Sequence, residues 1–426
     1  MMLGDHVKAS RSSHDHGEPL SPAARFFHAP RFNVYIIAIM GFKTRINPDV
    51  VKAGLEQTLV KHPRFSSKMV VDGNKYCKNK KWTQTKVNLE DHIIVPELDP
   101  NIEFPDSFVE DYVSNVTRTP LDLSKPLWEL HILNIKTSDA EAVGVFRIHH
   151  SMGDGASLIS LLLACTRKTS DPEALPSVPV KKRAGSTFNS RDGFWWFFLA
   201  IWLFLRLIWN TFEDVLLFVA TILFLNDTKT PIKGAPGVEL NVKKFVHRIV
   251  SLDDIKLVKN AMNTTVNDVV VGLTQAGLSR YLNHRYSGEE QKDGRVKESN
   301  SNIPKGIRLR TVILVNLRKS AGIQVPAAII RRAFSNITMA TSGVIGPQEE
   351  ISFYGHPIAY LAPTVYGPPI SLVVHFQSYV NKMTISLSVD PSVIPDPHEL
   401  CNDIEESLKL VRDAAINKGL VKLDVV

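Results

Sequence analysis

The chain of 426 residues has few cysteines and no long block of like charge. Cys77, Cys165 and Cys401 lie far apart without a CxxC pair, which argues against structural disulfides and against a zinc site. The first residues lack the apolar core of a secretory signal peptide. The formal net charge is +7, but the basic residues are scattered, so we expect no nucleic-acid partner. These absences predict a reducing compartment, with the folded lobes facing the cytosol.

Hydrophobic residues make up 44% and charged residues 22% of the chain, which is typical of a globular protein. The length predicts two lobes or domains. Shifts in composition suggest these boundaries: a disordered tail 1–18, a first lobe 19–167, a linker 168–193, a hydrophobic helix 194–225 and a second lobe 231–426.

Apolar runs and cap signals predict a mixture of α and β structure. In the first lobe we expect strands at 32–42, 126–133 and 141–150, and a helix over 50–63 that Asn47 caps. In the second lobe we expect strands at 243–252, 309–318, 331–346, 370–379 and 382–390, with helices starting near Asp253, over 263–285 and over 398–417.

Residues 194–225 are almost wholly apolar and aromatic, and as a helix they are long enough to cross a bilayer core of about 30 Å. On a helix Arg206, Asn210, Glu213 and Asp214 form one polar stripe, in which Arg206 can pair with Asn210 or Glu213. Such charges are costly in a lone span, so spanning the membrane and lying in its interface both stay open. A buried core helix would not carry this much apolar surface, so we expect membrane attachment.

The stretch FRIHHSMGDGAS, residues 146–157, ends an apolar strand on two histidines. His149 and His150 point to opposite faces because side chains alternate along a strand. Asp154 lies between two glycines, which we expect at strained turn positions, and it can cap a helix that starts at Ala156. A neutral imidazole can deprotonate an alcohol near pH 7, but two paired core histidines beside a cap fit the residues as well. Adjacent strand histidines rarely share one ion, so no metal site is expected.

The segment HHSMGDG matches the HHxxxDG motif of acyl-CoA-dependent acyltransferases. Together with PLWELHIL, VNDVVVGLTQAGLSRYL and SNITMATSGVIGP, in this order along nearly the whole chain, it resembles the plant wax ester synthase/diacylglycerol acyltransferase family. The resemblance implies an α/β fold with mixed sheets: two lobes like those of chloramphenicol acetyltransferase, with an active-site tunnel between them and a membrane-associated hydrophobic helix.

The resemblance also implies roles for the residues of the motif. His150 would be the general base and His149 would support it. Asp154 would brace the turn through an arginine, for which Arg25 and Arg318 are the candidates. The reaction would need no covalent acyl-enzyme, no metal and no cofactor, because acyl-CoA is itself a substrate.

Asn267, in VNDVVVG, matches an asparagine-aspartate pair of the family and could donate a hydrogen bond near the oxyanion or the acyl chain, or it could be the N-cap of a helix. Gly155 is a further candidate for substrate binding. The partners that the resemblance implies are long-chain acyl-CoA, a fatty alcohol or diacylglycerol, and membrane lipid. The expected location is the endoplasmic reticulum membrane, the plasma membrane or both.

The chain departs from the family after Arg318, where only KSAGIQVPAAIIRRAF precedes SNITMATSGVIGP and relatives carry several dozen more residues. Relatives also tend to have Asn where Gly343 stands. A second hypothesis is therefore a catalytically inactive, membrane-associated lipid-binding homologue, or a misspliced product.

Overall fold

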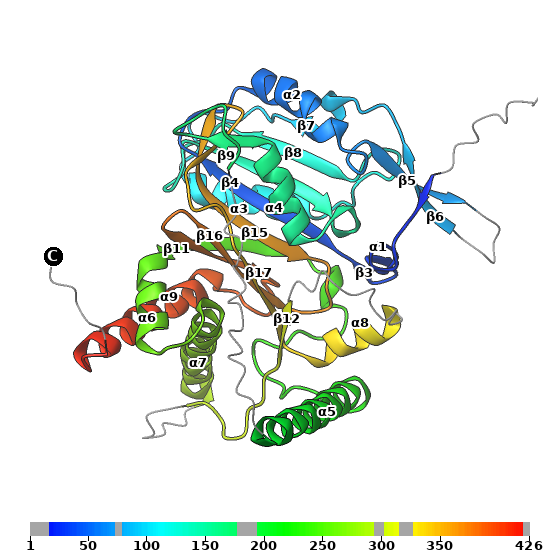
Figure 1. Ribbon diagram of the computed structural model, residues 1–426. Coiled ribbons are helices and arrows are strands. Elements are labelled where there is room, and N and C mark those ends of the chain that lie inside the picture. Colours follow the sequence, from blue (N-terminus) through cyan, green and yellow to red (C-terminus); the bar gives the residue numbers. More distant parts are fainter. Residues whose placement is uncertain (1–16, 73–78, 177–193, 294–301, 315–326, 421–426) are drawn as a thin grey trace, which may run out of the picture.

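The computed structural model describes residues 17–72, 79–176, 194–293, 302–314 and 327–420. The chain forms a mixed α/β structure of two lobes, each built on one large sheet (Figure 1). The first lobe has a seven-stranded sheet in the order β10-β14-β15-β4-β9-β8-β7, and the second has a five-stranded sheet in the order β11-β17-β16-β13-β12.

The elements of the first half of the chain mostly build the first lobe. Its strands are β1 (Glu18–Pro19), β2 (His28–Ala29), β3 (Phe32–Asn33), β4 (Tyr35–Phe42), β5 (Ser67–Asp72), β6 (Asn79–Gln84), β7 (Ile93–Ile94), β8 (Trp128–Leu133), β9 (Ala142–His149) and β10 (Thr166–Lys168). Its α-helices are α1 (Pro22–Phe26), α2 (Pro48–Gln57), α3 (Pro105–Val116) and α4 (Gly155–Ala164). Short 3-10 helices lie at Leu59–Lys61, Leu89–Asp91 and His150–Met152.

The rest of the chain begins with the long helix α5 (Phe194–Leu223) and a 3-10 turn at Val238–Leu240. The remaining helices are α6 (Leu252–Ala261), α7 (Val266–Asp293), α8 (Ala327–Asn336) and α9 (Pro397–Asn417). The remaining strands are β11 (Lys244–Ser251), β12 (Thr311–Leu314), β13 (Met339–Val344), β14 (Ile351–Phe353), β15 (His356–Tyr366), β16 (Leu372–Tyr379) and β17 (Lys382–Val389). Helices α6, α7 and α9 pack on the five-stranded sheet around one apolar core (Figure 1).

Strands β14 and β15 belong to the range expected for the second lobe, yet they complete the sheet of the first. β15 pairs antiparallel with β4 over almost its whole length, with Thr364 opposite Ile37, and β14 pairs with β10. β15 also packs against β16 and β17 of the second lobe. One strand therefore ties the two lobes together.

The prediction of one strand over 331–346 was wrong, because helix α8 continues to Asn336 and β13 begins only at Met339. Ile330, Phe334 and Ile337 pack into one apolar cluster. Their spacing of four and three residues places them on one helical face, so the local pattern has a helical and not a strand period.

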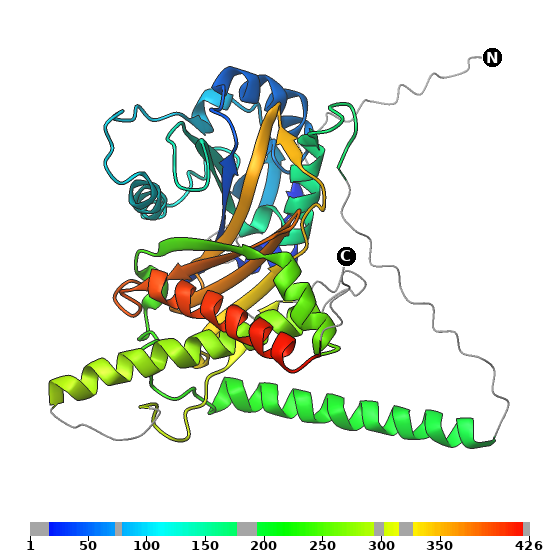
Figure 2. The same cartoon turned by 90° about the vertical axis from the view of Figure 1, so that its left-hand side faces the viewer.

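Helix α5 extends away from the second lobe (Figure 2). Its described large apolar side chains are exposed along its length. The guanidinium of Arg206 lies over the ring of Trp202, 5.3 Å from its centroid, and does not make the predicted pair with Asn210 or Glu213. In the part of the chain that the structure describes, no helix is both long and apolar enough to cross a membrane.

The C-terminal end of α5 is held by α8. Arg332 Nε donates to the carbonyl of Ile222 over 2.6 Å, and Arg332 Nη2 donates to that of Leu223 over 3.1 Å. Asn336 Nδ2 donates to the carbonyl of Thr221 over 2.6 Å. These bonds satisfy carbonyls that the end of a helix leaves without an intrahelical partner.

Candidate active site

The two histidines of the motif lie at the end of β9, which runs between β4 and β8 in the sheet. His149 is opposite Tyr35 of β4, and its backbone N–H donates to the carbonyl of Leu127 over 3.0 Å. The backbone N–H of His150 donates to the carbonyl of Val34 over 2.9 Å. One backbone hydrogen bond to a neighbouring segment therefore holds the main chain of each histidine in place.

His149 is buried and its ring is fully bonded. Its Nδ1 lies 2.7 Å from Ser151 Oγ and accepts from the backbone N–H of Ser151 over 3.2 Å. Its Nε2 lies 2.8 Å from Asn33 Oδ1, and its ring stacks on that of His28 at 3.9 Å. Since Nδ1 accepts from a backbone N–H, the proton is on Nε2 and is donated to Asn33. His149 has no nitrogen left to act on a substrate.

Burial, followed by the neighbouring imidazoles of His28 and His150 and the charge of Lys80, lowers the pKa of His149 to about 2. Burial and Lys80 also lower the pKa of His28 to about 4. Both rings are therefore neutral at pH 7 and pack as core groups.

His150 is placed differently. Its ring stacks on that of Phe27, with centroids 4.0 Å apart, and its Nδ1 is buried without a hydrogen-bond partner in the described part of the chain. Burial lowers the pKa of His150, while its own backbone carbonyl and the carboxylate of Asp154 raise it by less. The imidazole is thus neutral near pH 7, as a general base must be.

Asp154 is the N-cap of α4, as the sequence indicated. Its Oδ1 accepts from the backbone N–H of Ser157 over 2.8 Å. Of its two candidate arginine partners, Arg25 donates through Nε to the carbonyl of Leu20 over 3.0 Å, and Arg318 lies outside the described residues.

The expectation of strained glycines in this turn was wrong. Gly153 has φ 177°, which is extended backbone that any residue adopts, and Gly155 is outside the left-handed region. The chain reverses through the 3-10 turn at His150–Met152 and the cap of α4, which begins at Gly155 and not at Ala156. A Cβ on Gly155 would lie 3.7 Å from Val344 Cγ2, which is an ordinary van der Waals contact, so this neighbour does not require glycine at position 155.

The interpretation of Asn267 as an N-cap was also wrong. Thr265 caps α7: its Oγ1 accepts from the backbone N–H of Asp268 over 3.2 Å, and Asp268 Oδ2 accepts from the backbone N–H of Thr265 over 2.9 Å. This reciprocal pair leaves the side chain of Asn267 free of a capping role. Its Oδ1 would lie 3.8 Å from a Cβ on Gly343, so Asn267 faces β13 of the second lobe.

Two polar residues of β16 were missed from the sequence. His375 is buried, its Nδ1 lies 3.5 Å from Thr364 Oγ1, and burial and the neighbouring imidazole of His150 lower its pKa to about 4. Gln377 is fully buried, and its Oε1 has no hydrogen-bond partner among the described residues. The available signal was two polar residues at i and i+2 inside the apolar run ISLVVHFQSY, which places both on one face of the strand.

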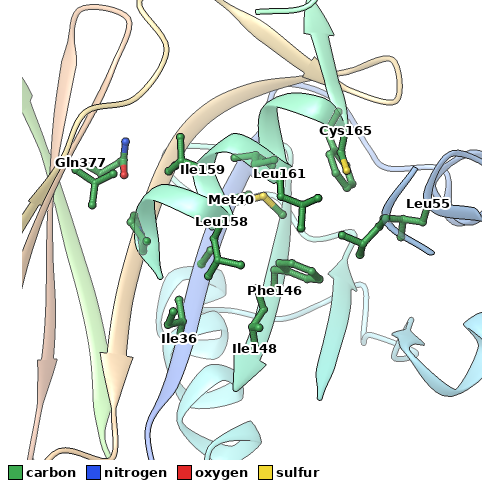
Figure 3. Close-up of a pocket in the computed structure, with 17 residues that line it drawn as sticks. Ile36, Met40, Leu55, Phe146, Ile148, Leu158, Ile159, Leu161, Cys165 and Gln377 are labelled. Atoms are coloured by element: carbon green, nitrogen blue, oxygen red, sulfur yellow. The ribbon is translucent and has the colours of Figure 1, made fainter. Parts of the chain in front are cut away.

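An apolar cavity lies between α4 and the sheet of the first lobe (Figure 3). Ile36 and Ile148 line one end, while Leu55 and Cys165 line the other (Figure 3). Its other lining residues include Ala38, Met40, Leu59, Phe146, Gly155, Leu158, Ile159, Leu161, Leu162, Val344, Phe353, Pro363 and Gln377. The cavity follows α4 over its ten residues, about 15 Å at the rise of an α-helix. Its volume is about 90 Å³, and its apolar walls suit a hydrocarbon group.

The described residues hold no group of three or more His, Cys, Asp and Glu side chains that could bind a metal ion.

Comparison with known families decides the relationship. Residues 29–270 match the wax ester synthase/diacylglycerol acyltransferase catalytic domain, and residues 307–412 match the WS/DGAT C-terminal domain. The chain belongs to the wax ester synthase/diacylglycerol acyltransferase family. The resemblance seen in the motif and its flanking segments is thereby confirmed.

Relatives from Arabidopsis thaliana cover nearly the whole chain. Wax ester synthase/diacylglycerol acyltransferase 11 is 44% identical, over 99% of this chain and 100% of its own. Wax ester synthase/diacylglycerol acyltransferase 5 is 47% identical, over 93% of each chain. The alignment with the first runs over 496 positions, more than the 426 residues here, so that relative carries residues that this chain does not.

Solved structures show the same fold. The wax ester synthase/diacylglycerol acyltransferase from Marinobacter aquaeolei VT8 matches with a TM-score of 0.59 at 15% identity, over 93% of this chain and 99% of the other. The first condensation domain of the calcium-dependent antibiotic synthetase matches with a TM-score of 0.53 at 13% identity, over 95% of this chain and 97% of the other. At these identities the likeness concerns the arrangement of the two lobes.

Proposed function

We propose that this chain transfers a long-chain acyl group from acyl-CoA to a fatty alcohol, to diacylglycerol or to both, with His150 as general base. The observation that carries this proposal is a half-buried imidazole whose pKa is lowered, at the end of β9 and close in the chain to residues that line an apolar cavity along α4. The family adds the reaction class, since its members are named for wax ester and diacylglycerol acylation.

The reaction is a direct transfer. His150 takes the proton of the acceptor hydroxyl, and the alkoxide oxygen attacks the carbonyl carbon of the thioester. The tetrahedral intermediate then expels the CoA thiolate, which takes the proton back from His150, so that one ester and one free CoA form. The apolar cavity holds the acyl chain, and no cofactor or metal enters any step.

The supporting residues keep the base in place. His149 ties the end of β9 to Asn33 and Ser151, and Asp154 caps α4 directly after the turn. Gly155 lines the start of the cavity without a side chain that would narrow it. Asn267 lies on the second lobe, with its Oδ1 3.8 Å from the position of a Cβ on Gly343.

The same proposal includes attachment to a membrane through α5. The support is the exposure of its large apolar side chains, Trp202, Phe204, Trp209 and Phe212 among them. A helix of this kind can lie in the membrane interface with its polar stripe in water. We propose the endoplasmic reticulum membrane, the plasma membrane or both as the location, with the two lobes in the cytosol. The lipid substrates and the ester product would then partition into the membrane to which α5 attaches the site.

The test uses the full chain, purified in detergent, with labelled palmitoyl-CoA and either hexadecanol or diacylglycerol. We expect ester with at least one acceptor, and a loss of about 100- to 10,000-fold in kcat for His150→Ala. The matched control is His62→Ala, an exposed histidine of the same lobe, which should keep its activity.

Equal activity of His150→Ala and the unaltered chain would remove His150 from the mechanism. No product with either acceptor from folded protein would contradict the enzyme and favour the inactive lipid-binding homologue. Circular dichroism of each variant separates a lost base from a lost fold.

A further inference from the structure

A second, larger cavity lies next to the C-terminal end of α5, outside the site described above. Its volume is about 910 Å³, within the range typical of small-molecule sites. It opens between the hairpin of β2 and β3, the segment that follows α5, and the end of α8.

The walls of this cavity carry an excess of positive charge. Five cationic side chains line it, against two carboxylates: Arg31, Lys229, Lys233, Arg331 and Arg332, and Asp227 and Glu239. Both carboxylates already have cationic partners. Glu239 Oε1 accepts from Arg31 Nε over 2.7 Å, and Asp227 Oδ1 accepts from Arg310 Nη1 over 2.8 Å.

The remaining cations are only partly balanced, since the carboxylate of Asp227, which is already paired with Arg310, is the one that acts on Lys233. Lys233 Nζ donates to the carbonyl of Asn336 over 3.0 Å, and Arg332 donates to the last carbonyls of α5. Within the described ranges, no ion pair involves Lys229 or Arg331. Cations gathered in a concave site raise the local concentration of anions, and arginine and lysine are the side chains that bind phosphate.

The basic cavity is close to the base in the fold. Arg31 directly precedes Phe32, whose ring meets that of Phe334 on α8 at 5.6 Å. Phe32 belongs to an apolar cluster with Ile36, which lines the acyl cavity, and with Ile337, which lines the basic cavity. Phe27, which stacks on His150, packs against the same cluster. Both cavities therefore border one cluster that reaches the base.

We infer that this basic cavity binds the phosphates of the nucleotide end of acyl-CoA. The inference rests on the proposed function and names how its donor is held. Coenzyme A carries a 3′-phosphoadenosine diphosphate at one end and the thioester at the end of a flexible pantetheine arm. With its phosphates in the basic cavity and its acyl chain in the cavity along α4, the donor would extend its pantetheine arm across the apolar cluster of Phe32, beside His150.

The test compares two donors on the full chain in detergent: palmitoyl-CoA and palmitoyl-pantetheine, which lacks the nucleotide. In the double variant Lys229→Ala/Arg331→Ala we expect the KM for palmitoyl-CoA to rise at least about tenfold, with the KM for palmitoyl-pantetheine unchanged. Binding of adenosine 3′,5′-bisphosphate, measured by calorimetric titration without turnover, should weaken by a similar factor. The control Lys86→Ala/Arg118→Ala removes two exposed cations that line neither cavity.

An unchanged KM for palmitoyl-CoA in the double variant would overturn the inference while leaving the acyltransferase intact. If the unaltered chain makes no ester from either donor, the proposed function fails, and the bisphosphate titration still decides the cavity. A lipid headgroup offers the same phosphate chemistry, so flotation with phosphatidylcholine vesicles, with and without phosphatidylserine, forms the last arm. Loss of binding to the anionic vesicles alone, with donor kinetics unchanged, would assign the cavity to membrane phosphate and reject the nucleotide.

Discussion

The two walls of the site offer different chemistry. The first-lobe wall, formed by β4, β9 and α4, is an apolar lining that ends on one imidazole. The second-lobe wall, formed by β13 and β16, presents His375 and Gln377 on one face, opposite Ser342 and Val344 in the sheet register. On the proposed mechanism the first wall would hold hydrocarbon and the base, whereas the second presents buried hydrogen-bonding groups, of which Gln377 Oε1 has no partner among the described residues. The difference suggests that charge formed during the reaction meets the second lobe.

The strongest test of this difference between the two walls is to remove the imidazole of His375. Its neutral imidazole, close to His150, can donate to an oxyanion, so His375→Ala should lower kcat by about 100-fold. His375→Gln keeps an N–H donor and should recover part of the loss. His284→Ala, an exposed histidine of the same lobe, is the control. If His375→Ala lowers the melting temperature but leaves kcat unchanged, His375 contributes only to packing in the second wall.

The acid stability of the fold tests the first wall. The pKa of His149 is about 2 in the folded chain and near 6.5 when unfolded, so below pH 6.5 only the unfolded state gains the proton. The free energy of unfolding should therefore fall as the pH falls, by about 2 kcal/mol at pH 5 from this residue. Urea unfolding at pH 7 and pH 5 measures the loss, which His149→Gln should reduce and His284→Gln should not. Equal losses in all three proteins would contradict a neutral structural His149.

A bulkier side chain at the far end of the acyl cavity tests whether the first wall binds the acyl chain. Cys165 follows the last turn of α4, about 15 Å along the helix from Gly155. Cys165→Phe shortens the cavity, so the ratio of octanoyl to palmitoyl transfer in a mixed-donor assay should rise several-fold. Cys165→Ala leaves the room open and is the control. An unaltered ratio from folded Cys165→Phe would place the acyl chain elsewhere.

The smallest expected effect concerns Asp154, which borders the first wall without lining it. Asp154→Ala removes the cap bond to Ser157 and should cost about 1 kcal/mol in the free energy of unfolding. Asp154→Asn keeps an accepting oxygen and should cost little. Chemical denaturation of both variants checks this, and equal losses would show that the charge, and not the cap, is what stabilises the turn.

Much of the local structure could be predicted from the sequence, because its signals are local. The apolar runs of β4, β8 and β9 and the cap of α2 by Asn47 follow from residues that touch within a few positions. The cap by Asp154 is of the same kind. The helix α8 was missed because its residues were read together with those of β13 as one strand, although Ile330, Phe334 and Ile337 have helical spacing.

The relations between the two walls could not be predicted in this way. No local pattern places His375 beside His150, since the two come together where β15 of the first sheet packs against β16 of the second. The same holds for the engagement of Asn267 with β13, and for the transfer of residues 351–366 into the first sheet.

The position of β15 has a consequence for how the chain comes apart. Its bonds to β4 belong to the first sheet, and its side chains pack on β16 and β17 of the second. The first half of the chain lacks two strands of its own sheet, β14 and β15, whereas the second half contains all five strands of its sheet and carries these two in addition. A protein cut between the halves should therefore yield a first fragment that folds only when the second is added, and the intact chain should lose both lobes in a single cooperative transition.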